Sequence, residues 1–501
     1  MGFPRCSNLN IFPTKVMIDR FLRYFTFVIL VFTNVIEISN AQNINRSKFR
    51  DVVYSTRLDR YLTRDEAVAV TPMQSPFVMS LNGYWKISSQ TNGTSIVKIP
   101  GIWSQNANEH KRNLVYKSRE SLDALKNIEQ CTIEREFELT QEWLDRETFI
   151  EINNHKAVGV TLTINGSKVD YIADSKDFVK FDITGFVREG INSIKIALDR
   201  YSVGTFLSSG RYVTSPTAQI GDINLTSAPK FRIEDFELVT KYDSTGRNGL
   251  FELKMIVANG RNFAETGTIY YDLMNSKGEL IRYNYRDVTI SGLGRDTLVF
   301  EGRIDKVEKW SGVNPVTYKL MMRTKKDGDF TEYVPFEFGF RTLNYENKTL
   351  EINGVRTSIK TLDYGYNNLS KKELYAKIAQ AKKQGYNTFL LTIPQTPMFY
   401  EICTQKGMYV IDAVDISPVI DDEIKNIANA PELLKYFYER CLNTYLRNRN
   451  YSCVIAWSLG NSEFNGYNYK KSYLYFKNEL DSVRPIVFKG AAGEWNNDEI
   501  N

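Results

Sequence analysis

The sequence predicts a multidomain protein in which two β-sandwiches precede a parallel α/β domain. The 501 residues, 42% of them hydrophobic, are enough for three or four packed domains. Before about residue 350, apolar and polar residues alternate as they do in strands with one buried face. After it, apolar runs without alternation are separated by helical segments, which is typical of a parallel sheet covered by helices.

The N-terminal residues have the layout of a secretory signal. An apolar run at 24–32 follows Arg20 and Arg23, and small residues come after it. The run is shorter than the roughly 20 residues of a transmembrane helix, so no stable membrane anchor is expected. We expect a signal peptide at 1–41, export to the periplasm or the extracellular space, and an N-terminal extension at 42–80.

Alternation and turn signals predict the two sandwiches. Strands with one apolar face run from 158 to 164 and from 251 to 257. Asn-Gly pairs favour the tight turns of β-hairpins, and among the pairs in the chain are those that begin at Asn82, Asn92, Asn165, Asn248, Asn259 and Asn353. A break near Pro229 separates two blocks of strands. We expect one sandwich at 81–228 and a smaller one at 229–342.

Helix and strand signals alternate in the last third of the chain. Ser370 and Glu373 form a capping box, which predicts a helix that ends at Gly385. Further helices are predicted at 397–406 and 431–447, and buried strands at 387–393, 408–411, 453–459 and 485–488. A β/α barrel and a doubly wound sheet both fit this order, and periodicity does not choose between them.

Composition excludes several classes of function. The net charge is only +5 and the longest basic blocks are lysine pairs, so nucleic acid is not expected as a partner. With two histidines and no P-loop, GxGxxG or HExxH motif, neither a metal nor a cofactor is expected. The four cysteines after the signal are expected to be buried thiols, with a Cys441–Cys453 disulfide as the alternative in an oxidising compartment.

Short motifs along the chain point to one family. They are Leu-Asn-Gly-Tyr-Trp at 81–85, Ile-Pro-Gly-Ile-Trp at 99–103, Phe-Asp-Ile-Thr at 181–184, Gly-Phe-Arg at 339–341, Asn-Gly at 353–354, Arg-Asn at 449–450 and Trp-Ser-Leu-Gly-Asn at 457–461. These motifs resemble glycoside hydrolase family 2, the β-galactosidases, β-glucuronidases and β-mannosidases. The resemblance implies a jelly-roll-like sugar-binding sandwich, an immunoglobulin-like sandwich and, at 343–501, a TIM barrel. It also implies a glycan or glycoside as partner.

The barrel that the resemblance implies is incomplete at its C-terminal side. A TIM barrel takes about 250 residues, whereas 343–501 holds signals for five of the eight strands, namely a first strand around 364–366, which the resemblance implies, and the four predicted above. Unpaired strand edges promote aggregation unless something covers them. Either a second chain completes the barrel, or the reading frame is truncated.

The resemblance implies an O-glycosyl hydrolase whose catalytic residues are eroded. Family members hydrolyse β-glycosides with retention, using two carboxylates. Asn461 would hold the sugar 2-hydroxyl. In the family the acid/base glutamate comes directly after this asparagine, but here the next residue is Ser462. A serine hydroxyl cannot act as a general acid near neutrality. Glu463 is the substitute candidate, although a shift by one residue tends to turn a side chain away from the site. The family's nucleophile comes from a later strand, beyond the five predicted.

Other family positions have also changed. Tyr364, Gly365 and Tyr366 replace arginine, histidine and glutamate, Tyr451 replaces a histidine, and Ala413 replaces a glutamate beside the retained Asp412. For sugar stacking the candidates are Trp457, Tyr364, Tyr366 and Tyr451, with a place in the barrel core as the alternative for Trp457. Three hypotheses remain open: a secreted β-glycosidase, a pseudoenzyme that binds glycan or a partner without hydrolysis, and a degenerate fragment.

Overall fold

The computed structural model describes residues 56–69, 75–89, 93–104, 130–153, 159–174, 178–199, 202–208, 217–365, 369–416, 427–460, 465–491, 494–495 and 498. The chain divides into two units, Met1–Val53 and Tyr54–Asn501, and every described residue belongs to the second. The expected signal peptide therefore lies outside the described residues. Within the described part, the chain has no helix with the length and apolarity to cross a membrane.

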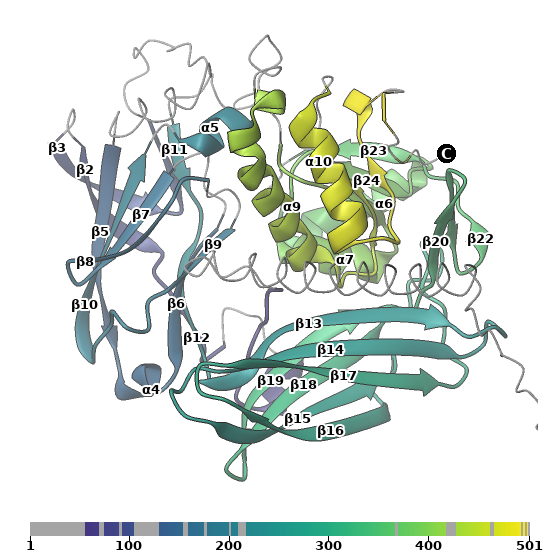
Figure 1. Ribbon diagram of the computed structural model, residues 1–501, viewed down its shortest axis with the longest axis horizontal. Helices are drawn as coiled ribbons and strands as arrows, with labels where there is room; N and C mark the ends of the chain where they lie inside the picture. The colour runs from purple at the N-terminus through teal and green to yellow at the C-terminus, as the bar shows by residue number, and fades with distance from the viewer. Residues whose placement is uncertain are drawn as a thin grey trace, which may run out of the picture. The chain divides into compact units, whose positions relative to one another are not determined.

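The first block of strands forms antiparallel sheets (Figure 1). One sheet has the order β1-β12-β6-β9, the other β3-β2-β5-β10-β7-β8, and β4 pairs with β11. The bounds are β1 Val78–Ser80, β2 Gly83–Ser89, β3 Gly93–Ile99, β4 Gly101–Ser104, β5 Gln130–Leu139, β6 Glu147–Asn153, β7 Gly159–Ile164, β8 Ser167–Ile172, β9 Phe178–Asp182, β10 Gly190–Asp199, β11 Thr217–Ile220 and β12 Ile223–Ala228. The predicted alternation is confirmed in β7, where Val160, Leu162 and Ile164 are fully buried. Short helices α4 (Gln141–Leu144) and α5 (Val203–Ser208) lie in the connections.

The second block forms a sandwich of two antiparallel sheets, ordered β13-β14-β17 and β16-β15-β18-β19. The bounds are β13 Phe231–Tyr242, β14 Gly249–Asn259, β15 Glu265–Met274, β16 Leu280–Ile290, β17 Arg295–Ile304, β18 Tyr318–Lys326 and β19 Asp329–Phe338. Alternate residues of β14, from Phe251 to Val257, face the core between the sheets as predicted. Burial of these apolar side chains is the main stabilising contribution of such a core.

The Asn-Gly pairs make hairpin turns at two of the expected places. Asn165-Gly166 joins β7 to β8, and Asn353-Gly354 joins β21 (Thr349–Ile352) to β22 (Val355–Arg356), each with positive φ at both residues. Type I′ turns require this backbone conformation. Asn248 ends the longer loop of the hairpin that joins β13 to β14, whereas Asn82 precedes β2 and Asn259 ends β14, and these two form no tight hairpin. Asn92 lies outside the described residues.

The third block is a parallel sheet with the strand order β23-β24-β25-β26-β27. Its strands are β23 Thr361–Tyr364, β24 Thr388–Leu391, β25 Tyr409–Ala413, β26 Val454–Ser458 and β27 Ile486–Val487, preceded by the small sheet of β20 (Leu343–Glu346), β21 and β22. Its helices are α6 Lys371–Lys383, α7 Pro397–Lys406, η3 Pro431–Leu433, α9 Leu434–Asn448, α10 Tyr467–Tyr475, η4 Phe476–Leu480 and η5 Lys489–Ala491. Strands in sequential order are typical of a β/α barrel, whereas a doubly wound sheet reverses its order at a switch point.

Local signals place the helices as predicted. In α6 the Ser370 side chain accepts from the backbone N–H of Glu373, whose carboxylate accepts from the Ser370 N–H in return. Helix α7 ends at Gly407, which has a φ of +62°. A Cβ there would lie 2.7 Å from the carbonyl oxygen of Gly312, so both backbone conformation and space require glycine.

Polar side chains join the parallel sheet to the second sandwich. The amide of Asn450 donates to the carbonyl of Phe236 and accepts from the N–H of Leu238, both on β13, at 2.9 Å. Arg449 pairs with Asp235 at 2.9 Å. These groups follow α9 directly, so the connection from α9 to β26 lies against β13.

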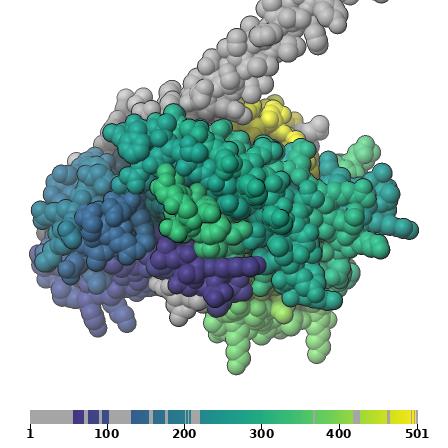
Figure 2. Space-filling model, turned by 90° about the horizontal axis from the view of Figure 1, so that it is seen from below, coloured from purple at the N-terminus to yellow at the C-terminus, as the bar shows by residue number. Residues whose placement is uncertain are grey.

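The segment from 56 to 69, which includes α2 (Arg64–Ala69), lies along the second sandwich (purple against teal and green in Figure 2). Arg60 Nε donates to Glu332 Oε2 at 2.8 Å, and Glu332 is fully buried. The other carboxylate oxygen accepts from the N–H of Ile233 and the hydroxyl of Thr324, each at 2.7 Å. One buried carboxylate therefore links this segment to both sheets of the sandwich.

We expect Glu332→Gln to lower the free energy of unfolding by about 3 kcal/mol, because loss of the carboxylate leaves the buried charge of Arg60 without a partner. The glutamine keeps an oxygen for Ile233 and Thr324 but turns an N–H toward the Arg60 guanidinium. Urea unfolding followed by tryptophan fluorescence measures the change. Glu301→Gln, an exposed position on β17, is the control. Equal midpoints for the two variants would contradict the role of the pair.

Candidate functional site

The C-terminal ends of the parallel strands meet at one edge of the sheet, where a β/α barrel carries its active site. At this edge β26 ends with Ser458, and Gly460 follows with a φ of +102°. A Cβ at Gly460 would lie 2.1 Å from the carbonyl oxygen of Ile416, so only glycine fits. Asn461, Ser462, Glu463 and, after β23, Tyr366 lie outside the described residues.

Asp412 on β25 is fully buried and faces the helices. Its carboxylate accepts from the Tyr400 hydroxyl of α7 at 2.8 Å, from the Asn448 amide of α9 at 2.7 Å, and from the N–H of Ala413 at 3.0 Å. Burial raises the pKa of Asp412 to about 6, and these hydrogen bonds oppose the rise. The structure thus places Asp412 between two helices, where it ties α7 and α9 to the sheet.

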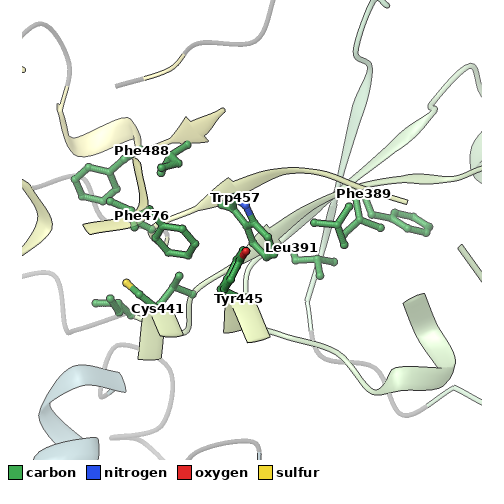
Figure 3. Close-up of a cluster of buried hydrophobic side chains, with 14 of the residues drawn as sticks. Phe389, Leu391, Cys441, Tyr445, Trp457, Phe476 and Phe488 are labelled. Atoms are coloured by element: carbon green, nitrogen blue, oxygen red, sulfur yellow. The ribbon is translucent and has the colours of Figure 1, made fainter. Parts of the chain in front are cut away.

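Trp457 lies in the core between sheet and helices. It is fully buried, its ring packs against Tyr445 at 5.9 Å and Phe476 at 5.6 Å between ring centroids, and the three side chains converge in Figure 3. Its Nε1 donates to Asp481 at 2.8 Å. This packing supports the core alternative for Trp457.

The two other described tyrosine candidates are also covered by rings. Tyr364 is 2% exposed and packs on Phe389 and Phe399, with centroids 4.8 and 4.9 Å away. Tyr451 is 7% exposed and stacks on Tyr400 at 5.2 Å. A sugar could stack on either ring only after these neighbours had moved. The structure therefore does not gather Trp457, Tyr364 and Tyr451 around one open surface.

Strand register explains why these residues lie on the helix side. Asp412 pairs with Trp457, and Ala413 with Ser458, so each pair shares one face of the sheet. Since side chains alternate along a strand, the opposite face carries Ala413, Ser458 and, on β23, Asp363. Asp363 is exposed. It is a carboxylate on the inner face of the sheet, and motif comparison missed it, although alternation from Tyr364 would have found it.

The electrostatics of the described part offer little for metal or thiol chemistry. No group of three or more His, Cys, Asp or Glu side chains that could hold a metal ion occurs among the described residues. Cys441 and Cys453 are buried thiols, so the alternative of a disulfide between them was wrong and the thiol prediction is confirmed. Burial raises the pKa of both thiols to about 12, which keeps them uncharged.

Two sandwiches followed by parallel strands in sequential order define a protein of the sandwich-and-barrel class. Residues 231–341 match the sequence profile "Glycosyl hydrolases family 2", and residues 342–501 match "Glycosyl hydrolases family 2, TIM barrel domain". Together the two matches cover more than half of the chain. The chain belongs to glycoside hydrolase family 2, as its motifs predict.

Curated relatives are β-galactosidases of about twice its length. That of Priestia megaterium is 24% identical over 489 residues, which cover 89% of this chain and 46% of the relative. That of Oenococcus oeni is 23% identical, covering 91% and 47%. The chain thus spans about half the length of the curated relatives that it matches.

Solved structures of other family activities share the fold. A β-glucuronidase of Bacteroides uniformis superposes with a TM-score of 0.67 at 16% identity, covering 82% of this chain and 52% of that one. A β-D-mannosidase of Dictyoglomus thermophilum gives 0.64 at 15%, covering 82% and 57%. At 15 and 16% identity, these similarities show a shared fold.

Asp412→Asn tests the buried carboxylate through pH. Because the folded pKa is about 6 and the ordinary value 3.8, the folded state binds more protons between these limits, and stability falls as pH rises through them. We expect the variant to lose this fall and so to gain about 1 to 3 kcal/mol relative to the unmodified chain between pH 4 and 7.5. Urea unfolding at several pH values measures it, with the exposed Asp363→Asn as control. If Asp412→Asn and the unmodified chain showed the same dependence of stability on pH, the raised pKa of Asp412 would be contradicted.

Proposed function

We propose that this family 2 protein acts in carbohydrate metabolism as a relative of retaining β-galactosidases whose hydrolysis is impaired. The observation that carries the proposal is the position of Ser462, two residues after Gly460, where the acid/base glutamate of the family is expected. A hydroxyl cannot protonate the leaving oxygen at neutral pH, and loss of such an acid costs about 10² to 10⁴ in rate.

The residues at the described strand ends give a second argument for impaired hydrolysis. Retention needs two carboxylates about 5 to 5.5 Å apart. On the inner face, β25 and β26 offer Ala413 and Ser458, which are not carboxylates, and Asp412 is held by helices on the other face. Among the described inner-face positions of β23, β24, β25 and β26, the acidic one is Asp363 on β23. We infer that Glu463 supplies the acid in any residual turnover.

The nucleophile would then come from further strands that pair beside the described sheet. Among the described residues β23 and β27 each pair on one side, as the outer strands of the sheet. Open edges favour pairing with further strands. A chain that adds strands beside β27 would bring side chains to the same C-terminal edge as Glu463.

For the substrate we propose a terminal β-galactoside. The proposal follows the curated relatives, which are β-galactosidases at 23 to 26% identity. The structural neighbours named for glucuronide and mannoside chemistry share only the fold at their identities. A β-glucuronide is therefore the matched alternative substrate for the assay.

Leaving groups of different acidity test the missing acid directly. We expect residues 42–501 to hydrolyse a dinitrophenyl β-galactoside at least about 100-fold faster than a methylumbelliferyl or alkyl β-galactoside, because a good leaving group needs no proton. Glu463→Gln should abolish residual turnover of the poor leaving groups, and Asp363→Asn should not. Rates are followed by absorbance, with the oligomeric state recorded by sedimentation.

Similar rates for all leaving groups, abolished in Glu463→Gln, would show an intact acid/base and overturn the proposed impairment. No turnover of any substrate by a folded protein that still binds a β-galactoside would support the non-catalytic glycan-binding alternative. Preference for the β-glucuronide would overturn the proposed substrate.

We also propose that the protein is exported, on the basis of residues 1–41. Expression of the full chain in a Gram-negative host should yield a periplasmic protein whose N-terminal sequence begins at Gln42. Signal peptidase needs a small residue before the cleaved bond, so Ala41→Arg should accumulate as the longer precursor. Asn40→Arg, at the neighbouring and more tolerant position, is the control. An uncleaved cytoplasmic product of the unmodified chain would contradict export.

A further inference from the structure

Arg341 follows β19 and reaches the N-terminal edge of the parallel sheet. It is 7% exposed, and its Nη2 donates to the carbonyl of Val454, the first residue of β26, at 2.8 Å. Its Nη1 is buried and makes no hydrogen bond to the described residues. The described ion pairs do not include one between Arg341 and a carboxylate. A buried guanidinium is thus left with an unused donor and no paired charge.

Arg484 approaches the same place from the start of β27. Its Nη2 donates to the carbonyl of Arg449, its Nε lies 3.5 Å from Asp481, and its guanidinium lies over the Trp457 ring. Its Nη1 is also buried without a hydrogen-bond partner among the described residues. Two arginines that are far apart in the sequence therefore each keep one unused N–H inside the protein.

Both side chains hold the short connection between α9 and β26. Arg484 binds the carbonyl at its first residue, Arg449, and Arg341 binds the carbonyl just after it, at Val454. Burial and then repulsion by Arg484 lower the pKa of Arg341 to about 9. Asp481 is the acidic group nearby, and it already accepts from Trp457 Nε1.

The local charge is therefore unbalanced. Arg341 and Arg484 contribute two positive charges, and Asp481 contributes one negative charge. A water molecule could accept from the two unused N–H groups, but it would leave the excess charge uncompensated in a buried place, which is costly. An anion would satisfy both donors and the charge together.

We propose that Arg341 and Arg484 bind a small monovalent anion, such as chloride, at the N-terminal edge of the parallel sheet. This edge is opposite the one at which β26 ends with Ser458, so the anion site is separate from the proposed glycoside site and does not depend on it. Bound there, the anion stabilises the connection on which β26 and β27 begin.

Anion-specific thermal stability is the first test. We expect the unfolding temperature of residues 42–501 to rise by about 3 to 6 °C between 1 and 200 mM sodium chloride, beyond the effect of sodium gluconate at equal ionic strength. The rise should saturate. Arg484→Gln should lose at least half of the chloride-specific part. Arg303→Gln, which removes an arginine from an exposed ion pair on β17, should keep all of it.

Bromide gives a test that needs no variant. Crystals of the unmodified protein soaked in sodium bromide should show an anomalous peak within hydrogen-bond distance of both Nη1 atoms. Equal stabilisation by chloride and gluconate, or bromide peaks elsewhere with none at this pair, would overturn the proposal. Self-association that chloride weakens would also overturn it, because a carboxylate of a second copy would then occupy the two arginines.

Discussion

Asn450 and Ser452 make the hydrogen bonds on which the position of the parallel sheet depends. Asn450 satisfies one carbonyl and one N–H of β13, and the Ser452 hydroxyl contacts both the N–H and the carbonyl of Gly339. Each of these side chains is at least 94% buried, so a lost partner would leave backbone groups unsatisfied at about 1 to 3 kcal/mol each. The connection from α9 to β26 therefore cannot shift without disturbing the second sandwich, and β26 is the strand that leads to the site.

These hydrogen bonds fix the N-terminal edge of the parallel sheet. They do not fix the residues that follow the strands at the C-terminal edge. The contacts of Arg341, Arg449 and Asn450 lie where β26 begins. Asp412, near the opposite end of β25, fixes the helices rather than the connections beyond the strands. Residues that follow the strands can consequently change without loss of the framework, as loops on rigid scaffolds generally can.

The sequence predicted those parts of the fold that have local causes. The capping box at Ser370, the end of α7 at Gly407 and the buried alternation of β14 each arise from a few neighbouring residues. The face on which a site residue lies depends on register between strands, so the motif alone could not tell that Asp412 and Trp457 point to the helices. Asn259 ends β14 without a tight turn, and its side-chain amide donates to the carbonyl of Ile290 at the end of β16, in the facing sheet of the sandwich.

The family motifs fall into two groups, one that holds the junction between sandwich and sheet and one at the edge of the proposed site. Those at the N-terminal edge, Gly-Phe-Arg at 339–341 and Arg-Asn at 449–450, bind backbone groups across the junction. The C-terminal edge, where β25 ends with Ala413 and β26 with Ser458, is the one that the proposed reaction would use. The motifs at the N-terminal edge hold the fold together, so their role does not depend on whether a substrate is hydrolysed. The contacts at the junction therefore maintain the fold, whereas the proposed reaction would depend on a separate set of residues at the opposite edge.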